Sequence, residues 1–468
     1  MRFALNDIIT AIATPPGISA IAVIRVSGNN AVSTVANFFD RPQKLTDAAG
    51  YQAVHGYILD GTEPVDEVIC IVYRSPHSYT GEEMTEIFCH GNPDLTARIL
   101  QLLLKNCRLA EPGEFTFRAF MNHKLDLAQA EAVNDLISAQ TGKSEQAALS
   151  QLRGNLSREI DSIVKELTDC RIRFELAIDF ADQDLPELDW DEVQSRMEKV
   201  HNRLEELLAG GKQGRILRDG YTVCLSGAPN VGKSSIFNRF LQENRALVTP
   251  VPGTTRDYLE EWLSLEGYPV RLQDTAGLHS TNDEVEILGI RRTQELMQKA
   301  DLVVILTDPD SLEEQFLLPE NVPSDKILCF MNKIDLLGFD KLPSASEWKK
   351  FLAASRFHSK IKNLVQLAPC SAVLADGLDT LKKLLLERIS LPNLQPSSVL
   401  VTNTRHLAAL QKCLDALNKA LEGTKNRAGY EFIAFDLIAA VSALAEITGA
   451  ITTDDLLDNI FSSFCIGK

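Results

Sequence analysis

The chain has 468 residues, which exceeds what one hydrophobic core supports and predicts about two to four domains. Its hydrophobic content of 45% and charged content of 24% are typical of a folded protein and exclude a disordered or membrane-embedded chain. The net charge of −17 repels a phosphate backbone, so tight RNA binding by this chain alone is disfavoured.

Cysteine usage and the N-terminal sequence both predict a cytoplasmic protein. The nine cysteines are scattered and include no Cys-x-x-Cys pair, which favours reduced thiols and argues against a zinc site. Asp7 and the pair Pro15-Pro16 interrupt the apolar segment that a signal peptide would need. No run of roughly 18 apolar residues occurs, so no membrane association is expected.

Residues 1–122 are predicted to form a small mixed α/β domain. Residues 18–26 are β-branched and apolar between turn residues, which predicts a buried strand, and 65–73 and 84–89 are similar. From 123 to 217 the pattern is helical. Apolar residues at steps of three and four there predict one face of a long amphipathic helix: Leu149, Leu152, Leu156, Ile160, Ile163 and Leu167.

Residues 218–390 alternate apolar strand runs with helices, as a parallel-sheet α/β domain requires. Pro392 and Pro396 then suggest an exit linker. The remaining stretch, 391–468, is helical again, with a seam of leucines that predicts packing on other helices: Leu407, Leu410, Leu414, Leu417 and Leu421. The expected fold class is therefore multidomain α/β plus α.

A phosphate-binding motif follows the first strand of the 218–390 region. The run GAPNVGKS, from Gly227 to Ser234, matches G-x-x-x-x-G-K-[ST] in full. Its glycines let backbone N–H groups close around phosphate oxygens at a helix N-terminus. Lys233 would reach the β- and γ-phosphates and act in catalysis, and Ser234 would bind Mg²⁺. The motif alone does not exclude a glycine-rich turn whose lysine is incidental and binds no phosphate.

Two further motifs follow in the order of a nucleotide switch. LQDTAGL places Asp274 at a strand end, beside the expected Mg²⁺, and Gly277, whose N–H would meet the γ-phosphate. In NKID, the carboxylate of Asp335 can accept from both N1–H and the N2 amine of guanine. Adenine offers no such donor pair, so the motifs together predict a GTPase. Ser371-Ala372 fits the loop that closes over the base, but carries no weight alone.

The expected catalytic groups differ from those of Ras-like enzymes, which orient water with a glutamine after D-x-x-G and often borrow an arginine finger worth roughly 10³ to 10⁵ in rate. Here that position is Leu278, which can do neither. Asn230 could help to hold a monovalent cation in place of the finger. One acid of the cluster Asp283, Glu284 and Glu286 could orient water, and a solvated acidic turn is the alternative.

Longer signatures beside these motifs resemble the MnmE (TrmE) family of tRNA-modification GTPases. They are ATPPG, IRVSG, SYTGEE, EPGEFTFRAFMNHKLDLAQAEAV, RIRFELAIDF, PGTTRD, DEVEILGI and the C-terminal DDLLDNIFSSFCIGK. The resemblance covers essentially the whole chain. It implies an N-terminal tetrahydrofolate-binding and dimerisation domain (1–122), a helical domain in two parts (123–217 and 391–468), and a P-loop G domain (218–390) inserted into the latter.

The resemblance also implies a function. Family members hydrolyse GTP and, with the flavoprotein MnmG in a heterotetrameric complex, modify carbon 5 of the wobble uridine (U34) in certain tRNAs. They install a 5-carboxymethylaminomethyl or aminomethyl group with a one-carbon unit from 5-formyl- or 5,10-methylene-tetrahydrofolate. They are homodimers whose G domains meet around K⁺, and tRNA is expected to bind mainly through the complex.

Site residues can be carried over from the family motifs. The resemblance implies that Thr255 joins Ser234 on Mg²⁺ and that Glu286 orients water. The implied K⁺ ligands are Asn230, Thr249, Val251 and Thr254. The implied folate-binding residues are Arg25, Glu86, Lys124 and Lys468. The residues expected to contact GTP are Asn230, Val231, Gly232, Lys233, Ser234, Ser235, Thr249, Pro250, Val251, Pro252, Gly253, Thr254, Thr255, Asp274, Thr275, Ala276, Gly277, Asn332, Lys333, Ile334, Asp335, Ser371, Ala372 and Val373.

Some points stay open at this stage. Cys465 would lie beside the folate pocket, either as a catalytic thiol or as a buried packing cysteine. His279 replaces a basic residue common in the family, and Asn92 replaces a glycine, so the backbone of that turn is expected to differ slightly. A ribosome-assembly switch GTPase shares the apolar residue after D-x-x-G, but usually carries a basic RNA-binding module. A nucleotide-stabilised scaffold would lack K⁺-dependent turnover.

Overall fold

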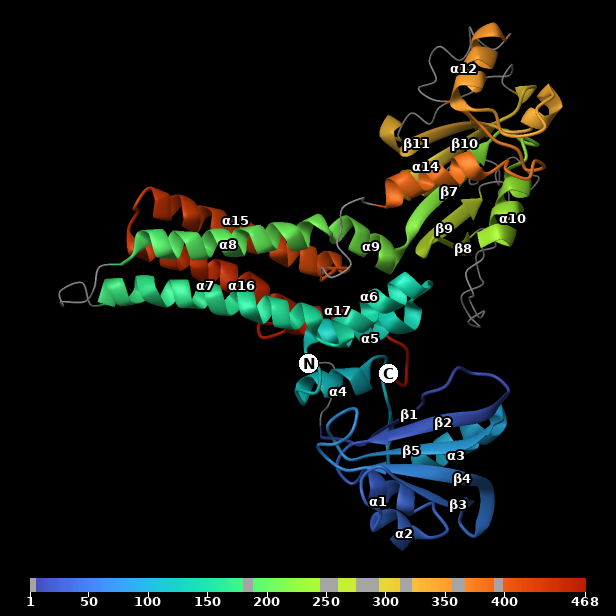
Figure 1. Ribbon diagram of the computed structural model, residues 1–468. Coiled ribbons are helices and arrows are strands. Elements are labelled where there is room, and N and C mark those ends of the chain that lie inside the picture. Colours follow the sequence, from blue (N-terminus) through green and yellow to red (C-terminus); the bar gives the residue numbers. More distant parts are fainter. Residues whose placement is uncertain are drawn as a thin grey trace. The chain divides into compact units, whose positions relative to one another are not determined.

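The computed structural model describes residues 6–179, 188–244, 260–274, 294–311, 322–355, 367–390 and 399–468 (Figure 1). Contacts divide the chain into two compact units. The first comprises Met1–Ile137, Ala148–Glu206 and Ala408–Lys468, and the second comprises Ser138–Ala147 and Leu207–Leu407. Within the described ranges, no helix has both the length and the hydrophobicity needed to cross a bilayer.

The first unit contains a six-stranded sheet ordered β3-β4-β5-β2-β1-β6. Neighbouring strands are antiparallel except β1 and β6, which pair in parallel. The strand bounds are β1 Ile9–Ile12, β2 Ser19–Ser27, β3 Gln52–Asp60, β4 Glu63–Tyr73, β5 Met84–Gly91 and β6 Arg108–Leu109.

Three helices cover one face of this sheet, where Ile24 and Cys70 lie in one core with Val35 and Ile99 of the helices. Alternate strand residues point to the opposite face, where Ile21 is 58% exposed. The strand predicted over 18–26 is therefore buried on one face only, which corrects that expectation. The covering helices are α1 Ala31–Ala36, α2 Pro42–Thr46 and α3 Pro93–Leu103.

Asn92 has a clear local role at the start of α3. Its backbone is extended, and its side-chain oxygen accepts from the N–H groups of Asp94 and Leu95. The residue is therefore the N-cap of α3, a position that favours asparagine because its side chain satisfies amides left free in the first turn.

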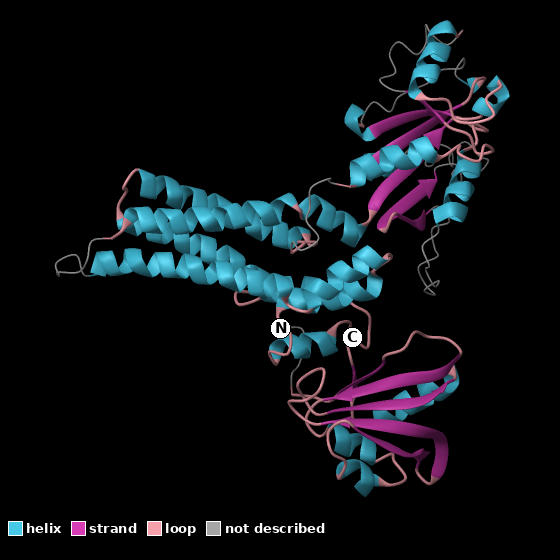
Figure 2. Ribbon diagram, in the orientation of Figure 1, coloured by secondary structure: helices cyan, strands magenta, loops and turns pink. Residues whose placement is uncertain are grey.

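Helices make up most of the rest of the first unit, and α6 begins in the second unit and ends in the first (Figure 2). The predicted stripe is confirmed along α7, where Leu156, Ile160, Ile163 and Leu167 are fully buried. The stripe does not lie on one continuous helix, because Gly154, with φ of +76°, separates α6 from α7. The helix bounds are α4 Glu114–Met121, α5 Leu127–Ser138, α6 Gly142–Leu152, α7 Asn155–Asp179, α8 Trp190–Ala209, α15 Thr404–Lys425, α16 Tyr430–Thr448 and α17 Asp454–Ser462.

The second unit is built on a six-stranded sheet ordered β12-β11-β10-β7-β9-β8, parallel except for the edge strand β8. Central strand β10 is buried along its whole length, as a sheet with both faces covered requires. The strand bounds are β7 Tyr221–Gly227, β8 Glu260–Leu265, β9 Tyr268–Asp274, β10 Leu302–Thr307, β11 Ile327–Met331 and β12 Leu367–Pro369.

Helices join these parallel strands, and the predicted class of α/β plus α domains is confirmed. In a parallel sheet, loops at the carboxyl ends of neighbouring strands converge at one edge, which is where the predicted nucleotide motifs lie. The α-helix bounds are α9 Gly211–Asp219, α10 Lys233–Asn244, α12 Ala345–Ala354 and α14 Asp379–Ile389, and the 3-10 helices are η3 Ser324–Lys326 and η4 Ile334–Leu337.

Candidate nucleotide-binding site

The loop between β7 and α10 has the backbone of a phosphate cradle. Gly227 has φ of +146° and Gly232 has φ of +90°, in the region that favours glycine. A side chain at Gly227 would collide with the carbonyl of Leu306, and one at Gly232 with the Asn332 amide. Asn230 also has a positive φ, of 62°. The loop can therefore bring its N–H groups close to an anion at the start of α10.

The residues predicted to bind phosphate and Mg²⁺ lie close together. Lys233 is buried, and its Nζ donates to the carbonyls of Gly227 (2.9 Å) and Ala228 (2.8 Å). Desolvation lowers the pKa of Lys233, although the charge of Asp274 opposes this. The Ser234 hydroxyl donates to Asp274 Oδ2 at 3.4 Å. Hydroxyl and carboxylate oxygens are the ligands that Mg²⁺ prefers, so the pair fits that ion.

The residues expected around the base form a hydrogen-bonded set. Asn332 donates from Nδ2 to the Val231 carbonyl (2.8 Å), and its Oδ1 accepts from Ala372 N (3.3 Å). Asn332 thus ties the phosphate loop to the loop after β12. Asp335 Oδ1 accepts from the Ser371 hydroxyl at 2.6 Å, so serine and carboxylate are fixed against each other. Val373, 77% exposed, donates its N–H to the same hydroxyl (3.1 Å).

Two charged residues that the sequence reasoning missed support this set. Asp308 accepts from Lys333 Nζ at 2.7 Å, and Lys333 has a left-handed φ of 60°. Burial would raise the pKa of Asp308, but hydrogen bonds from Lys333 and Ser311 lower it overall. Arg239 of α10 donates to the carbonyl of Ala375 at 2.7 Å. Asp308 comes directly after strand β10, and this position could have indicated a residue at the nucleotide edge of the sheet. Nothing in the sequence around Arg239 indicates its contact with Ala375.

Several predicted residues lie outside the described residues. They are Thr249, Pro250, Val251, Pro252, Gly253, Thr254 and Thr255, then Thr275, Ala276, Gly277, Asp283, Glu284 and Glu286. Of the others, Ile334 is buried, while Ser235 is exposed in the first turn of α10.

The predicted folate-binding residues come largely together in the first unit, on the sheet face not covered by α1 to α3. Arg25 of β2 and Glu86 of β5 are cross-strand neighbours, and Arg25 Nε donates to Glu86 Oε1 at 2.7 Å. Tyr73 donates its hydroxyl to Glu86 Oε2 at 3.0 Å, and burial, then Glu86, raise the pKa of Tyr73 to about 12. The Arg25 guanidinium lies 5.5 Å from the centre of the Tyr79 ring.

The C-terminal residues reach this cluster. Arg25 Nη1 donates to the carbonyl of Gly467 at 3.2 Å. Lys468 has its pKa lowered by burial and by Arg25, against the charges of Glu86 and Cys465. Lys124 instead donates to the Pro76 carbonyl at 3.1 Å, on the loop that carries Tyr79. Cys465 is exposed, so the alternative of a buried packing cysteine is wrong.

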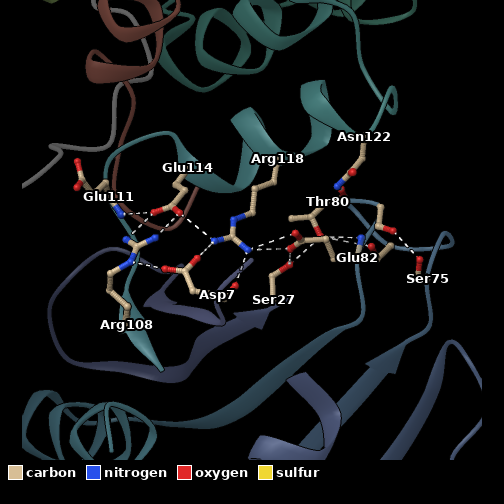
Figure 3. Close-up of polar contacts among 12 residues, drawn as sticks. Asp7, Ser27, Ser75, Thr80, Glu82, Arg108, Glu111, Glu114, Arg118 and Asn122 are labelled. Carbon is tan, nitrogen blue, oxygen red and sulfur yellow. Dashed lines mark hydrogen bonds and ion pairs between the residues drawn. The ribbon is translucent and has the colours of Figure 1, made fainter. Parts of the chain in front are cut away.

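A buried charge network supports that loop (Figure 3). Arg118 of α4 is fully buried and makes ion pairs with Asp7 (2.6 Å), Glu114 (3.1 Å) and Glu82 (3.2 Å). Arg108 of β6 pairs with Asp7 at 2.8 Å and with Glu114 at 2.7 Å. The network joins Asp7, β6, α4 and the loop before β5 through paired charges, which indicates a structural rather than a ligand-binding role.

Comparisons with known proteins agree with these motifs. A family model described as GTP-binding protein TrmE N-terminus matches residues 8–124, and one described as MnmE helical domain matches 127–465. Curated proteins named tRNA modification GTPase MnmE are similar over nearly the whole chain. The protein of Christiangramia forsetii is 40% identical over 99% of this chain and 100% of its own. That of Chlorobaculum tepidum is 39% identical (98% and 97%), and that of Moorella thermoacetica 40% (99% and 100%).

Proposed function

Because the chain belongs to the MnmE family of tRNA modification GTPases and is a GTPase, we propose that it is a K⁺-activated, Mg²⁺-dependent enzyme of the cytoplasm. With the flavoprotein MnmG, it adds a 5-carboxymethylaminomethyl or aminomethyl group to U34 of certain tRNAs. The observation that carries the proposal is the convergence of Lys233, Ser234 and Asp274 with Asn332 and Asp335 at one sheet edge. That arrangement fits a magnesium-bound guanine nucleotide.

A tetrahydrofolate derivative fits the cluster around Arg25. The glutamyl carboxylate of a folate needs cations, and Arg25 and Lys468 offer two. The pterin ring presents an amide and an amine, which a carboxylate such as Glu86 can accept from. Tyr73 and Tyr79 line the same cluster with aromatic surface. The bound folate would supply the one-carbon unit, while these side chains bind and orient it.

The uncovered sheet face of the first unit supports a homodimer. Ile21 of β2 and Ile69 of β4 are 58% and 46% exposed there, and Tyr57 of β3 is 37% exposed. A sheet face with several apolar side chains in contact with water is characteristic of a protein interface. We assign this face to the contact between two copies, within a heterotetramer that also contains MnmG.

Reconstitution tests the function and the folate assignment together. The chain, MnmG, tRNA, GTP, glycine and methylene-tetrahydrofolate are expected to yield modified U34 in nucleoside mass spectrometry. Arg25→Met should lower modification at least about tenfold, because the guanidinium that would bind the glutamyl carboxylate of the folate is lost, while GTP hydrolysis stays within about twofold. Arg41→Met, which removes a partly exposed ion pair with Asp40 away from this cluster, is the control. No product with the unaltered chain contradicts the function, and normal product with Arg25→Met contradicts the folate site alone.

Hydrolysis is expected to be at least about tenfold faster in K⁺ than in Na⁺ at equal ionic strength. Leu278 cannot stabilise transition-state charge, so a cation of suitable size must do so, held by Asn230, Thr249, Val251 and Thr254. Steady-state phosphate release in the two salts measures the effect. Asn230→Ala should reduce the difference between the salts. Equal rates in the two salts for the unaltered chain would rule out K⁺ activation.

Glu286→Ala should leave GTP affinity nearly intact and slow turnover by at least about 10². Water orientation matters only in the transition state, whereas Lys233 and Ser234 also hold the ground state. Single-turnover hydrolysis in saturating K⁺, beside nucleotide binding, separates the two effects. Asp283→Ala and Glu284→Ala are the matched controls, since a solvated acidic turn predicts the same small change at all three acids. Loss of GTP binding in Glu286→Ala would also contradict the assignment of Glu286 as the residue that orients water.

A further inference from the structure

The loop that the sequence predicts to close over the guanine base is internally hydrogen-bonded. We call residues 371–377, between β12 and α14, the base loop. The N–H of Ser371 donates to the carbonyl of Gly377 at 3.1 Å, and the N–H of Gly377 donates to the carbonyl of Leu374 at 3.0 Å. A side chain at Gly377 would collide with the carbonyl of Ser371. Because the Ser371 hydroxyl also donates to Asp335, a displacement of the base loop would release the carboxylate that is proposed to hold guanine.

Arg239, in the second turn of α10, is bonded to this loop through two of its nitrogen atoms. Its Nη2 donates to the carbonyl of Ala375 at 2.7 Å, and its Nη1 donates to the carbonyl of Ser371 at 3.4 Å. A planar guanidinium can make two such bonds at a fixed spacing, whereas the single ammonium of a lysine cannot. Helix α10 begins at Lys233, which is predicted to contact the phosphates. Arg239 therefore joins the loop expected at the base to the helix expected at the phosphates.

Two further charges orient the guanidinium. Glu243, one turn along α10, accepts from Arg239 Nε at 2.8 Å and from Lys382 Nζ of α14 at 2.6 Å. Lys382 also lies 3.8 Å from Asp379. Burial would raise the pKa of Glu243, but hydrogen bonds from Lys382 and Arg239 lower it overall, so this carboxylate is charged at neutral pH. The side chain of Arg239 is only 16% exposed, which limits the screening of the pair by water and salt.

The contacts of Arg239 lie on the base side of the proposed nucleotide site. Its hydrogen bonds go to the base loop and to Glu243, whereas Lys233, Ser234 and Asp274 are the groups proposed to hold phosphate and Mg²⁺. Loss of the guanidinium would therefore free the base loop and leave the phosphate groups in place. Because changes to one binding surface act mainly on the dissociation rate, the expected effect is on how fast a nucleotide leaves.

We propose that Arg239 is a positioning residue that holds the base loop over the guanine base and thereby sets how long a bound nucleotide stays. Glu243 and Lys382 keep its guanidinium in the required orientation. Arg239 acts through the base loop and Asp335, and it does not take part in the cleavage of the phosphate bond. This inference rests on the proposed guanine-nucleotide site and names a further residue that controls it.

The test is the release of GDP that carries a fluorophore on its ribose, chased from the full-length chain by excess unlabelled GDP. Arg239→Met is expected to release it at least about tenfold faster, because charge-assisted hydrogen bonds to the base loop are lost. Glu243→Gln keeps a hydrogen-bonding side chain but loses the charge, and should speed release a few-fold. GDP association, and single-turnover hydrolysis at saturating GTP, should stay within about twofold for both variants.

Arg388→Met is the matched control. Arg388 of α14 donates to the carbonyl of Asp325, so it makes the same kind of bond between a helix and another segment of the second unit. Asp325 lies in η3, directly before β11, and therefore at the amino edge of the sheet, whereas the nucleotide motifs lie at the carboxyl edge. Release of GDP from Arg388→Met should match release from the unaltered chain.

Each outcome decides a different point. If the unaltered chain does not bind GDP, the proposed nucleotide site fails. If it binds and Arg239→Met releases GDP at the unaltered rate, only the assignment of Arg239 fails. Slower hydrolysis at saturating GTP in Arg239→Met would show that the substitution also disturbs the phosphate side. Equal acceleration in Arg388→Met would show that the loss of any such bond has this effect, and either of these two results overturns the proposal.

Discussion

An Asp335→Asn variant is expected to lose about 10³-fold or more in its preference for GTP over xanthosine triphosphate. The carboxylate accepts two hydrogen bonds from guanine, whereas an amide presents a donor to one of those positions and leaves a buried group unpaired. In the structure the Asp335 carboxylate is held by the Ser371 hydroxyl at 2.6 Å, so it cannot turn away to relieve the mismatch. Competition binding with labelled GTP and xanthosine triphosphate measures the ratio.

Ser371→Ala is the matched control for this prediction. It removes the hydroxyl that holds the carboxylate but leaves both guanine acceptors in place, so affinity should fall only a few-fold with no change in base preference. If Asp335→Asn keeps the selectivity of the unaltered chain, then Asp335 does not contact the base, and the set around Asn332 must be assigned to another role.

An Arg118→Met variant should destabilise the first unit by about 3–5 kcal/mol. The side chain is fully buried, and its removal takes away the cation that pairs with Glu82 and leaves Asp7 and Glu114 with Arg108 alone. Because a multidomain chain does not unfold in one step, the measurement should be local. Hydrogen exchange of the backbone amides of α4, measured under conditions in which the protein stays folded, reports the free energy of local opening of that helix.

The pH dependence provides the control for this variant. Burial alone would raise the pKa of Asp7, but hydrogen bonds and charges of Arg108 and Arg118 lower it overall. A carboxyl group with a lowered folded-state pKa contributes stability above its ordinary pKa and loses it as the pH falls through the folded value. The difference between Arg118→Met and the unaltered chain should therefore shrink in acid. A constant difference at all pH values would mean that lost packing, not lost charge, causes the effect.

Much of the candidate nucleotide site could be proposed from the sequence because its chemistry is local. GAPNVGKS, DTAG and NKID each specify a backbone turn and its polar groups within a few residues, and the family recognised from the longer signatures is confirmed. The residues at which helices begin and end were harder to predict from the sequence. The stripe through Leu149 and Leu152 continued in register across Gly154, and periodicity alone cannot distinguish a tolerated glycine from a break.

Long-range contacts could not be read from the sequence in this way. The bond from Arg25 to the carbonyl of Gly467 joins residues 442 positions apart and depends on how the chain ends pack. Arg239 of α10 donates to the carbonyl of Ala375, 136 positions away, which sequence spacing could not reveal either. The grouping of Arg25, Glu86 and Lys468 was expected from the family resemblance alone, because single charged residues in a sequence have no local partner to reveal them.

The distribution of the thiols has a practical consequence. Burial raises the pKa of all eight other cysteines, which keeps them as unreactive thiols, whereas Cys465 is exposed three residues before Lys468. A maleimide fluorophore should therefore attach at Cys465 first, without engineered cysteines. Its emission would report the arrival of a ligand beside Arg25 in real time, and protection from labelling by that ligand would give its occupancy.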